Sequence, residues 1–242
     1  MPYQRYWIIF IGFMVAYDEL MENVARIRCD IAECLEKVGR TGSTVTIIAV
    51  TKKFPAEAVD AAVAAGLTDI GESRVQESAT KKPAVKASCR WHLIGHLQKN
   101  KIGKAIELYD MIQSVDSYEL AEAINAKATT PVDILLQVDS SGEETKFGID
   151  PDDVMQMVDN IGKLDNLRLR GLMTIGPLTE DETRIRHSFR LTKALFDKVK
   201  ENALSNVEMS YLSMGMSGDY QIAVEEGSNM VRIGTSLFGS RA

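Results

Sequence analysis

The sequence predicts a single (β/α)8 TIM-type barrel, an α/β fold, with an extra N-terminal helix. Eight short strand-like segments recur along the 242-residue chain, the first of them the β-branched run 45–50, and helical stretches separate them. This alternation favours parallel strands joined by crossover helices, and eight repeats match a closed barrel better than an open sheet. No linker rich in Gly, Ser or Pro divides the chain, so we expect one barrel domain over 17–242.

Residues 1–16 precede this pattern and are predicted to be a dispensable extension. The apolar run 7–17 is too short to cross a membrane as a helix. Only Arg5 provides a basic residue ahead of the run, which continues into Asp18 and Glu19 without a small-residue cleavage site. The segment therefore matches neither a membrane anchor nor a signal peptide.

The barrel pattern begins with a helix over 18–38, which Gly39 ends. Its apolar residues have the spacing of one helix face: Leu20, Val24, Ile27, Ile31, Leu35 and Val38. The run 45–50 is the first strand, and Pro55 opens a helix over 56–65. The other strands are predicted at 69–71, 90–94, 111–114, 133–138, 167–174, 208–212 and 230–233.

Two later helices have recognisable features. Asp150 can cap a helix whose first position is Pro151, and the acidic residues that follow favour the positive end of the helix dipole. The stretch 181–204 is the longest. Only 235–242 follow the eighth strand, too few for a full eighth helix, so we expect the N-terminal helix to fill that place.

The charge of the chain limits its possible partners, and its cysteines indicate its cellular setting. The formal net charge is -6 and the Lys and Arg residues are scattered, so we expect no nucleic-acid partner and no anionic membrane surface. A cationic pocket inside an acidic surface stays possible. Cys29, Cys34 and Cys89 are an odd number without C-x-x-C spacing, which indicates neither a disulfide framework nor a zinc site and fits a reducing, cytoplasmic setting.

The carboxyl ends of the strands are where a barrel of this type places its active site. Lys52 follows the first strand, so its stem is expected in the barrel mouth. Burial there would lower the pKa of its amine and raise the fraction of neutral amine that can attack an aldehyde. Lys53 lies nearer the next helix and is expected at the surface.

Glycine-rich segments follow the seventh and eighth strands, at 213–218 and 231–235. Backbone N–H groups, the hydroxyls of Ser217 and Thr235 and the guanidinium of Arg232 would suit a phosphate dianion. The glycines, Gly234 among them, could also serve only tight turns, but their position at the last two strands favours the phosphate site.

The histidines do not indicate a metal site. His92 and His96 are four residues apart, but the stretch between them reads as a strand that Gly95 interrupts. The two imidazoles therefore need not converge. His187 lies in a polar helical stretch and is expected at the surface.

Six stretches of the sequence match one known family: 49–52 (Ala-Val-Thr-Lys), 71–77 (Gly-Glu-Ser-Arg-Val-Gln-Glu), 91–101, 142–148, 212–217 and 231–241. They resemble the pyridoxal phosphate homeostasis proteins, which are similar to the N-terminal barrel domain of alanine racemase. The resemblance covers 17–242 in order. The family usually has Asn where this chain has Ser73, and often Asn where it has Asp139.

The resemblance implies that Lys52 holds pyridoxal 5′-phosphate (PLP) as an aldimine. It also implies that Ser217, Arg232, Gly234 and Thr235 lie in the phosphate region, and that Met173 and Ser213 lie near the coenzyme ring. The implied role is a cytoplasmic PLP-binding regulatory or carrier protein of vitamin B6 homeostasis, without established catalytic activity. We expect a monomer, with PLP-dependent enzymes as possible recipients of the coenzyme.

Two other functions stay open: a PLP-dependent, racemase-like enzyme and a phosphate-binding barrel enzyme without coenzyme. Racemisation needs acid–base groups on both faces of the substrate. Lys52 could serve one face, while the candidates for the other, His92 and Tyr211, have no position that the sequence fixes. The sequence has no room after its barrel for the β-rich second domain that completes the racemase site, which favours the carrier.

Overall fold

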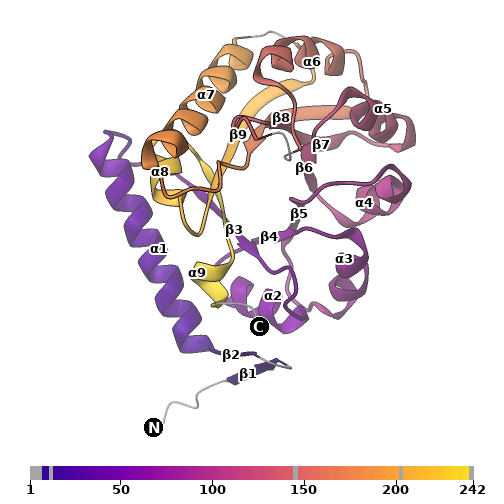
Figure 1. The fold of residues 1–242 in the computed structure, drawn as a ribbon. Helices are drawn as coiled ribbons and strands as arrows, with labels where there is room; N and C mark the ends of the chain where they lie inside the picture. The colour runs from indigo at the N-terminus through magenta and orange to yellow at the C-terminus, as the bar shows by residue number, and fades with distance from the viewer. Residues whose placement is uncertain (1–6, 11–12, 144–146, 202–203, 240–242) are drawn as a thin grey trace.

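Eight parallel strands close a barrel in the order β10-β3-β4-β5-β6-β7-β8-β9 (Figure 1). This computed structural model describes residues 7–10, 13–143, 147–201 and 204–239. The barrel strands are β3 Thr46–Val50, β4 Asp69–Glu72, β5 Arg90–Leu93, β6 Met111–Val115, β7 Val132–Val138, β8 Leu167–Thr174, β9 Val207–Met216 and β10 Met230–Ile233. The predicted TIM-type barrel is confirmed, and every predicted strand overlaps an observed one.

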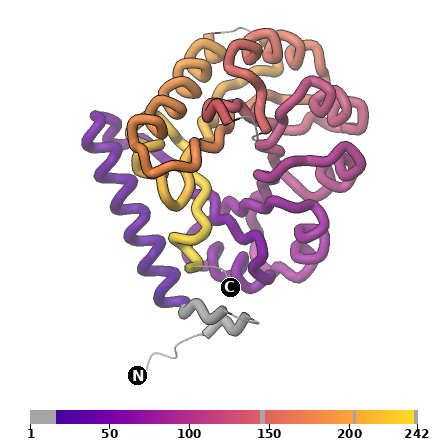
Figure 2. The backbone as a smooth tube through the Cα atoms, viewed as in Figure 1, coloured from indigo at the N-terminus to yellow at the C-terminus, as the bar shows by residue number. Residues whose placement is uncertain are grey.

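Helices alternate with the strands and surround the barrel (Figure 2). They are α1 Tyr17–Lys37, α2 Ala56–Ala64, α3 Val75–Lys81, α4 Ile102–Leu108, α5 Tyr118–Lys127, α6 Val154–Ile161, α7 Glu182–Lys200, α8 Tyr220–Glu225 and α9 Thr235–Phe238. Short 3-10 turns are η1 Lys82–Ala84, η2 Lys99–Lys101 and η3 Pro151–Asp153. Within the described residues, every helix is too short or too polar to cross a membrane.

The helix α1 occupies the predicted place of a full eighth helix. It packs beside α8 and the four-residue α9, and Asn23 Nδ2 donates to the Leu237 carbonyl at 3.2 Å. Its predicted apolar stripe is buried except for Val38, which follows the helix and is 37% exposed. Gly39, at φ 70°, ends the helix because the Arg40 N–H turns back to the Leu35 carbonyl at 2.8 Å.

The N-terminal segment forms a separate two-stranded antiparallel sheet. Its strands are β1 Trp7–Phe10 and β2 Phe13–Ala16, with Trp7 paired to Ala16. It takes no part in the barrel sheet. Deletion can therefore test the proposal that residues 1–16 are dispensable, because it removes no strand of the barrel.

The two later helices with recognisable sequence features are capped at their starts, and the cap at Asp150 is the predicted one. The Asp150 carboxylate accepts from the Asp152 N–H at 2.9 Å, ahead of η3 and α6. The Asp181 carboxylate accepts from the Thr183 N–H at 2.9 Å at the start of α7. Side chains at helix N-termini satisfy N–H groups that have no partner within the helix.

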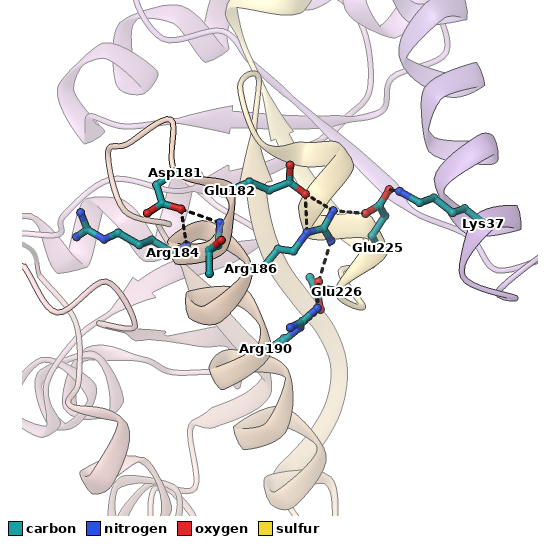
Figure 3. A network of polar contacts seen from close by, with 9 residues as sticks. Lys37, Asp181, Glu182, Arg184, Arg186, Arg190, Glu225 and Glu226 are labelled. Carbon is teal, nitrogen blue, oxygen red and sulfur yellow. Dashed lines mark hydrogen bonds and ion pairs between the residues drawn. The ribbon is translucent and has the colours of Figure 1, made fainter.

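Ion pairs fasten α8 between its neighbours (Figure 3). Arg186 of α7 donates to Glu225 at 2.5 Å and to Glu226 at 2.8 Å. Lys37 of α1 donates to Glu225 at 2.6 Å, and Arg190 donates to Glu226. These five residues are called the outer ion-pair network, and they hold the helix that follows the glycine-rich loop after β9.

Two apolar clusters divide the core. The larger lies between strands and helices, and the smaller fills the barrel itself with Ile48, Val50, Met111, Leu135, Met173 and Met230. Alternate residues of a strand point to opposite faces, so one strand can contribute to both clusters, as β3 does with Ile47 and Ile48. The barrel interior also contains buried polar side chains, which lead to the candidate site: His92, Gln113, Ser213 and Arg232.

Candidate functional site

A cleft of about 290 Å³ opens at the carboxyl ends of the barrel strands, close to the usual size range of small-molecule sites. Its lining is formed by Val50, Lys52, Ser73, Ile94, Ile175, Met216, Ser217, Gly218, Arg232, Gly234 and Thr235. Of the predicted site residues, Met173 and Ser213 are absent from this lining and fully buried. They lie one layer deeper, against lining residues.

The charge of the cleft is opposite to that of the whole chain. Among the described lining residues the charged side chains are the cations Lys52 and Arg232, whereas the chain carries a formal net charge of -6. The Asp219 carboxylate acts on Arg232 from outside this lining. A cleft of one sign concentrates ligands of the other sign. The described lining therefore fits an anionic ligand.

Lys52 lies in the turn between β3 and α2. It is partly buried and lines the cleft, while Lys53 is exposed, as the sequence predicts. The turn is tight because the Phe54 N–H donates to the Thr51 carbonyl at 2.9 Å and Lys53 adopts a left-handed φ of 66°. The backbone thus separates the two neighbouring lysines. Lys146, in the stretch 142–148 that carries part of the family resemblance, lies outside the described residues.

The glycine-rich loop contains an irregular strand end that the sequence does not predict. The strand β9 continues to Met216 instead of ending at 212, so Ser213 lies inside it. Met230 pairs with Ser213 and Arg232 with Met216, which places one extra residue on β9. Gly215, at φ 95°, is needed there, because a Cβ would lie 2.5 Å from the Ala223 Cβ of α8.

Ser217 joins the loops after β9 and β10. Its hydroxyl accepts from the Gly234 N–H at 3.3 Å and the Ser236 N–H at 3.2 Å. The hydroxyl and these N–H groups therefore meet at one side of the cleft. Space for a ligand lies next to them, since a Cβ on Gly218 would meet no atom within 4 Å.

The Arg232 guanidinium is fixed at the bottom of the cleft. Nη1 donates to the Ser213 carbonyl at 2.8 Å and its hydroxyl at 2.7 Å, and Nη2 donates to the Thr174 carbonyl at 2.6 Å. Burial lowers the pKa of Arg232 to about 10. The side chain therefore stays charged at neutral pH and is held by two strands.

A row of hydrogen bonds continues from Arg232 through the barrel. The Ser213 hydroxyl donates to Gln113 Oε1 at 2.7 Å, and Gln113 Nε2 donates to His92 Nδ1 at 3.1 Å. His92 Nε2 then lies 2.9 Å from Asp69 Oδ1. Because the Gln113 amide is a donor to Nδ1, this arrangement assigns the His92 proton to Nε2. We call these five residues the interior polar chain.

The three histidines lie in different environments and do not come together. His92 is buried in the barrel, while His96 stacks on the Phe147 ring at a centroid distance of 4.2 Å. His187 is exposed, as predicted. Among the described residues, no three His, Cys, Asp or Glu side chains are placed to hold a metal ion.

Comparisons with known proteins identify the family. Residues 23–242 match the model described as alanine racemase, N-terminal domain. The pyridoxal phosphate homeostasis protein of Pseudomonas aeruginosa is 38% identical over 227 residues, which cover 92% of this chain and 96% of the relative. The protein of that name from Aquifex aeolicus is 36% identical over 224 residues, covering 91% and 97%. The chain belongs to the pyridoxal phosphate homeostasis protein family.

Solved structures agree with this membership and confirm the predicted resemblance. A Bifidobacterium adolescentis protein described as unknown is 37% identical, with a TM-score of 0.88 over 97% of this chain and 99% of its own. PipY of Synechococcus elongatus, solved with PLP bound, is 34% identical, with a TM-score of 0.78 over 91% and 100%. An alanine racemase of Clostridium difficile shares the fold at 20% identity and a TM-score of 0.72, over 93% of this chain and 56% of its own.

Proposed function

We propose that this family member binds PLP at the barrel mouth and acts in the intracellular homeostasis of that coenzyme. The observation that carries the proposal is the cleft whose described lining contains Lys52 and Arg232 but no carboxylate. The family membership and the PLP-bound structure of the Synechococcus relative support it.

The cleft residues fit each part of the coenzyme. PLP supplies an aldehyde, which an amine can attack to form a C=N bond with release of one water. Lys52 provides the amine, since its partly buried side chain lines the cleft. Val50, Ile94, Ile175 and Met216 provide apolar surface for a ring.

We assign the phosphate region to Ser217, Gly234, Thr235 and Arg232. Two hydroxyls, backbone N–H groups and a guanidinium form a donor set suited to a dianion. Met173 and Ser213 form the layer beneath: Met173 packs in the cluster that includes the lining residue Ile175, and Ser213 accepts from Arg232. These two residues support the ring side of the site from below.

The carrier role is favoured over a racemase by the shortage of acid–base groups. Apart from Lys52 and Arg232, the polar side chains in the described lining are hydroxyls, those of Ser73, Ser217 and Thr235. His92 is fully buried and both its ring nitrogens have partners. Positioned acids and bases commonly contribute about 10²–10⁴-fold each.

Incubation of PLP-loaded protein with L- and D-amino acids in deuterium oxide tests this function. Deuterium exchange at Cα and chiral product are followed together. We expect slow exchange without inversion. Rapid exchange with inversion that is lost in Lys52→Ala would establish a racemase instead, and a protein that takes up no PLP at all would contradict the coenzyme site.

We also propose that the protein works as a cytoplasmic monomer and passes PLP to PLP-dependent enzymes. A transfer assay compares activation of an apo-enzyme by loaded protein with activation by the same concentration of free PLP, in the presence of a PLP-trapping phosphatase. Protected transfer supports delivery. Activation that falls to the level of trapped free PLP would restrict the role to storage.

A further inference from the structure

Three charged side chains meet behind the turn that carries Lys52. Lys81 Nζ lies 2.6 Å from Glu72 Oε1 and 2.9 Å from Glu77 Oε1. The side chain of Lys81 is 5% exposed, that of Glu72 is fully buried and that of Glu77 is 24% exposed. The three residues lie outside the described cleft lining, and the function proposed above gives them no role.

This cluster holds the residues on both sides of Lys52. Lys81 Nζ donates to the Thr51 carbonyl at 2.8 Å, and the Thr51 hydroxyl donates to Glu72 Oε1 at 2.6 Å. On the other side, the Lys53 backbone N–H donates to Glu77 Oε1. The same Glu77 oxygen accepts from Lys81. The turn is thus fixed immediately before and immediately after Lys52.

The placement of the three residues follows from simple local geometry. Glu72 is the last residue of β4, next to β3, from which the turn emerges. Glu77 and Lys81 are four residues apart on α3, so they share one helix face. The stretch 71–77 is among those that carry the family resemblance, and α3 directs its charged face toward the turn.

Stability alone is a poor explanation for the cluster. Buried charges lose their hydration, and a well-packed apolar group of similar size is often at least as stabilising. Glu72 Oε2 is buried without a hydrogen-bond partner, and burial raises the pKa of Glu72. Lys53 also holds a left-handed φ that non-glycine residues seldom adopt. The cluster thus holds the turn at Lys53 in an unfavourable conformation, although burying its own charged side chains is also unfavourable.

We propose that Glu72, Glu77 and Lys81 form a clamp that positions Lys52 for attack on the coenzyme aldehyde. The inference rests on the proposed function. The clamp acts through the backbone of Thr51 and Lys53, so its members are positioning residues. With the turn fixed before the ligand arrives, the amine is presented in one place and less freedom is lost when the covalent bond forms.

The first arm of the test is made without coenzyme. Amide hydrogen exchange of Lys53 is measured in wild type and in Glu77→Ala, a variant at the most exposed clamp position. We expect roughly fivefold to tenfold faster exchange, because the N–H loses its acceptor. Glu77→Gln keeps an oxygen that can accept from Lys53 and should restore most of the protection.

The second arm measures the rate constant for formation of the borohydride-stable adduct with PLP. Glu77→Ala and Lys81→Met should slow it about tenfold, since each loses at least one bond that fixes the turn. Lys82→Met is the matched control. Lys82 donates to the Leu108 carbonyl and lies 5.4 Å from the Trp91 ring centroid, so its loss removes similar contacts without touching the turn.

The results separate this inference from the proposed function. Faster Lys53 exchange and slower adduct formation in the clamp variants, with normal values in Lys82→Met and recovery in Glu77→Gln, support the clamp. Unchanged exchange and rate in Glu77→Ala overturn it, even if Lys81→Met fails to fold. A wild-type protein that forms no adduct contradicts the proposed function, while the exchange arm still decides whether the turn is clamped.

Discussion

Two polar networks of this molecule differ in their access to water. The outer ion-pair network joins α1, α7 and α8 near the surface (Figure 3). Its outer members Lys37 and Arg190 are 66% and 67% exposed, while Arg186 is 22% exposed and Glu225 and Glu226 are 11% exposed. The interior polar chain runs through the barrel, where His92, Gln113 and Ser213 have no exposed surface and Arg232 is 4% exposed.

The two networks differ in their role: the outer one holds helices together, and the interior one belongs to the site. When one member of an exposed ion pair is lost, water solvates the other, so such pairs contribute little to stability. When one member of a buried chain is lost, its partners stay unsatisfied in a medium of low dielectric. A barrel filled with apolar side chains avoids that risk. Polar residues that end at Arg232 in the cleft therefore indicate a site that needs a fixed, charged group.

The largest expected effect is that of Gln113→Leu. The change removes the acceptor of the Ser213 hydroxyl and the donor to His92 Nδ1. Each buried group left without a partner costs about 1–3 kcal/mol, so the free energy of unfolding should fall by about 2–6 kcal/mol. Urea denaturation measures it. Gln156→Leu, at an exposed position of α6, is the control, and an equally small effect for both variants would show that the interior polar chain adds no more stability than an exposed hydrogen bond.

Arg232→Lys should weaken PLP binding roughly tenfold to hundredfold, because the amine cannot reproduce the guanidinium contacts and a charge-assisted bond contributes about 1.5–3 kcal/mol. Fluorescence titration of the apo-protein gives the Kd. The control is Arg168→Lys, whose guanidinium pairs with Asp133 at the start of β7. An affinity equal to that of wild type would place Arg232 outside the coenzyme site.

Arg186→Ala tests the outer network and should reduce the free energy of unfolding by about 1–3 kcal/mol at pH 7, because its partners Glu225 and Glu226 are only 11% exposed. Burial acts to raise the pKa of Glu225, but hydrogen bonds from Lys37 and Arg186 outweigh it, and the pKa lies below its ordinary value of 4.5. A lowered carboxyl pKa stabilises the fold above the unfolded-state value, and the contribution is lost as pH falls through the folded-state value.

The difference between wild type and Arg186→Ala should therefore be complete at pH 7 and shrink below about pH 4.5. Thermal unfolding across this range measures it. A difference that stays constant down to pH 3 would mean that packing of the arginine stem, rather than its ion pairs, stabilises α8.

The smallest expected effect is that of deleting residues 1–13, so that the chain begins at Met14. The barrel sheet does not include this segment, so the melting temperature and the Kd for PLP should match those of the full chain. A large drop in either value would show that the N-terminal segment belongs to the functional unit.

The sequence predicts local features well. The strand 45–50 is recognisable because a β-branched run lies between turn residues, and α1 because its apolar residues follow one helix face. Lys52 and the glycine-rich loops were found from their positions at the strand ends, and the structure places them around one cleft.

Features that depend on contacts between distant residues were missed. The sequence gives one weak indication of the role of Gln113, since it is a polar residue that follows the apolar start of β6. The sequence gives no indication that Lys81 is buried. Lysines are rarely buried unless paired, and the buried partner Glu72 comes from another element. The extra residue of β9 arises from its register with β10, which no local pattern encodes.

The central claim, that Lys52 in the barrel mouth holds the coenzyme covalently, is tested by mapping the attachment site. Purified protein is loaded with PLP, reduced with borohydride and analysed by intact and peptide mass spectrometry. We predict one adduct per chain, on Lys52, and none in Lys52→Ala. An adduct on the neighbouring Lys53 or on Lys146, or a loaded protein without any reducible adduct, would contradict the account.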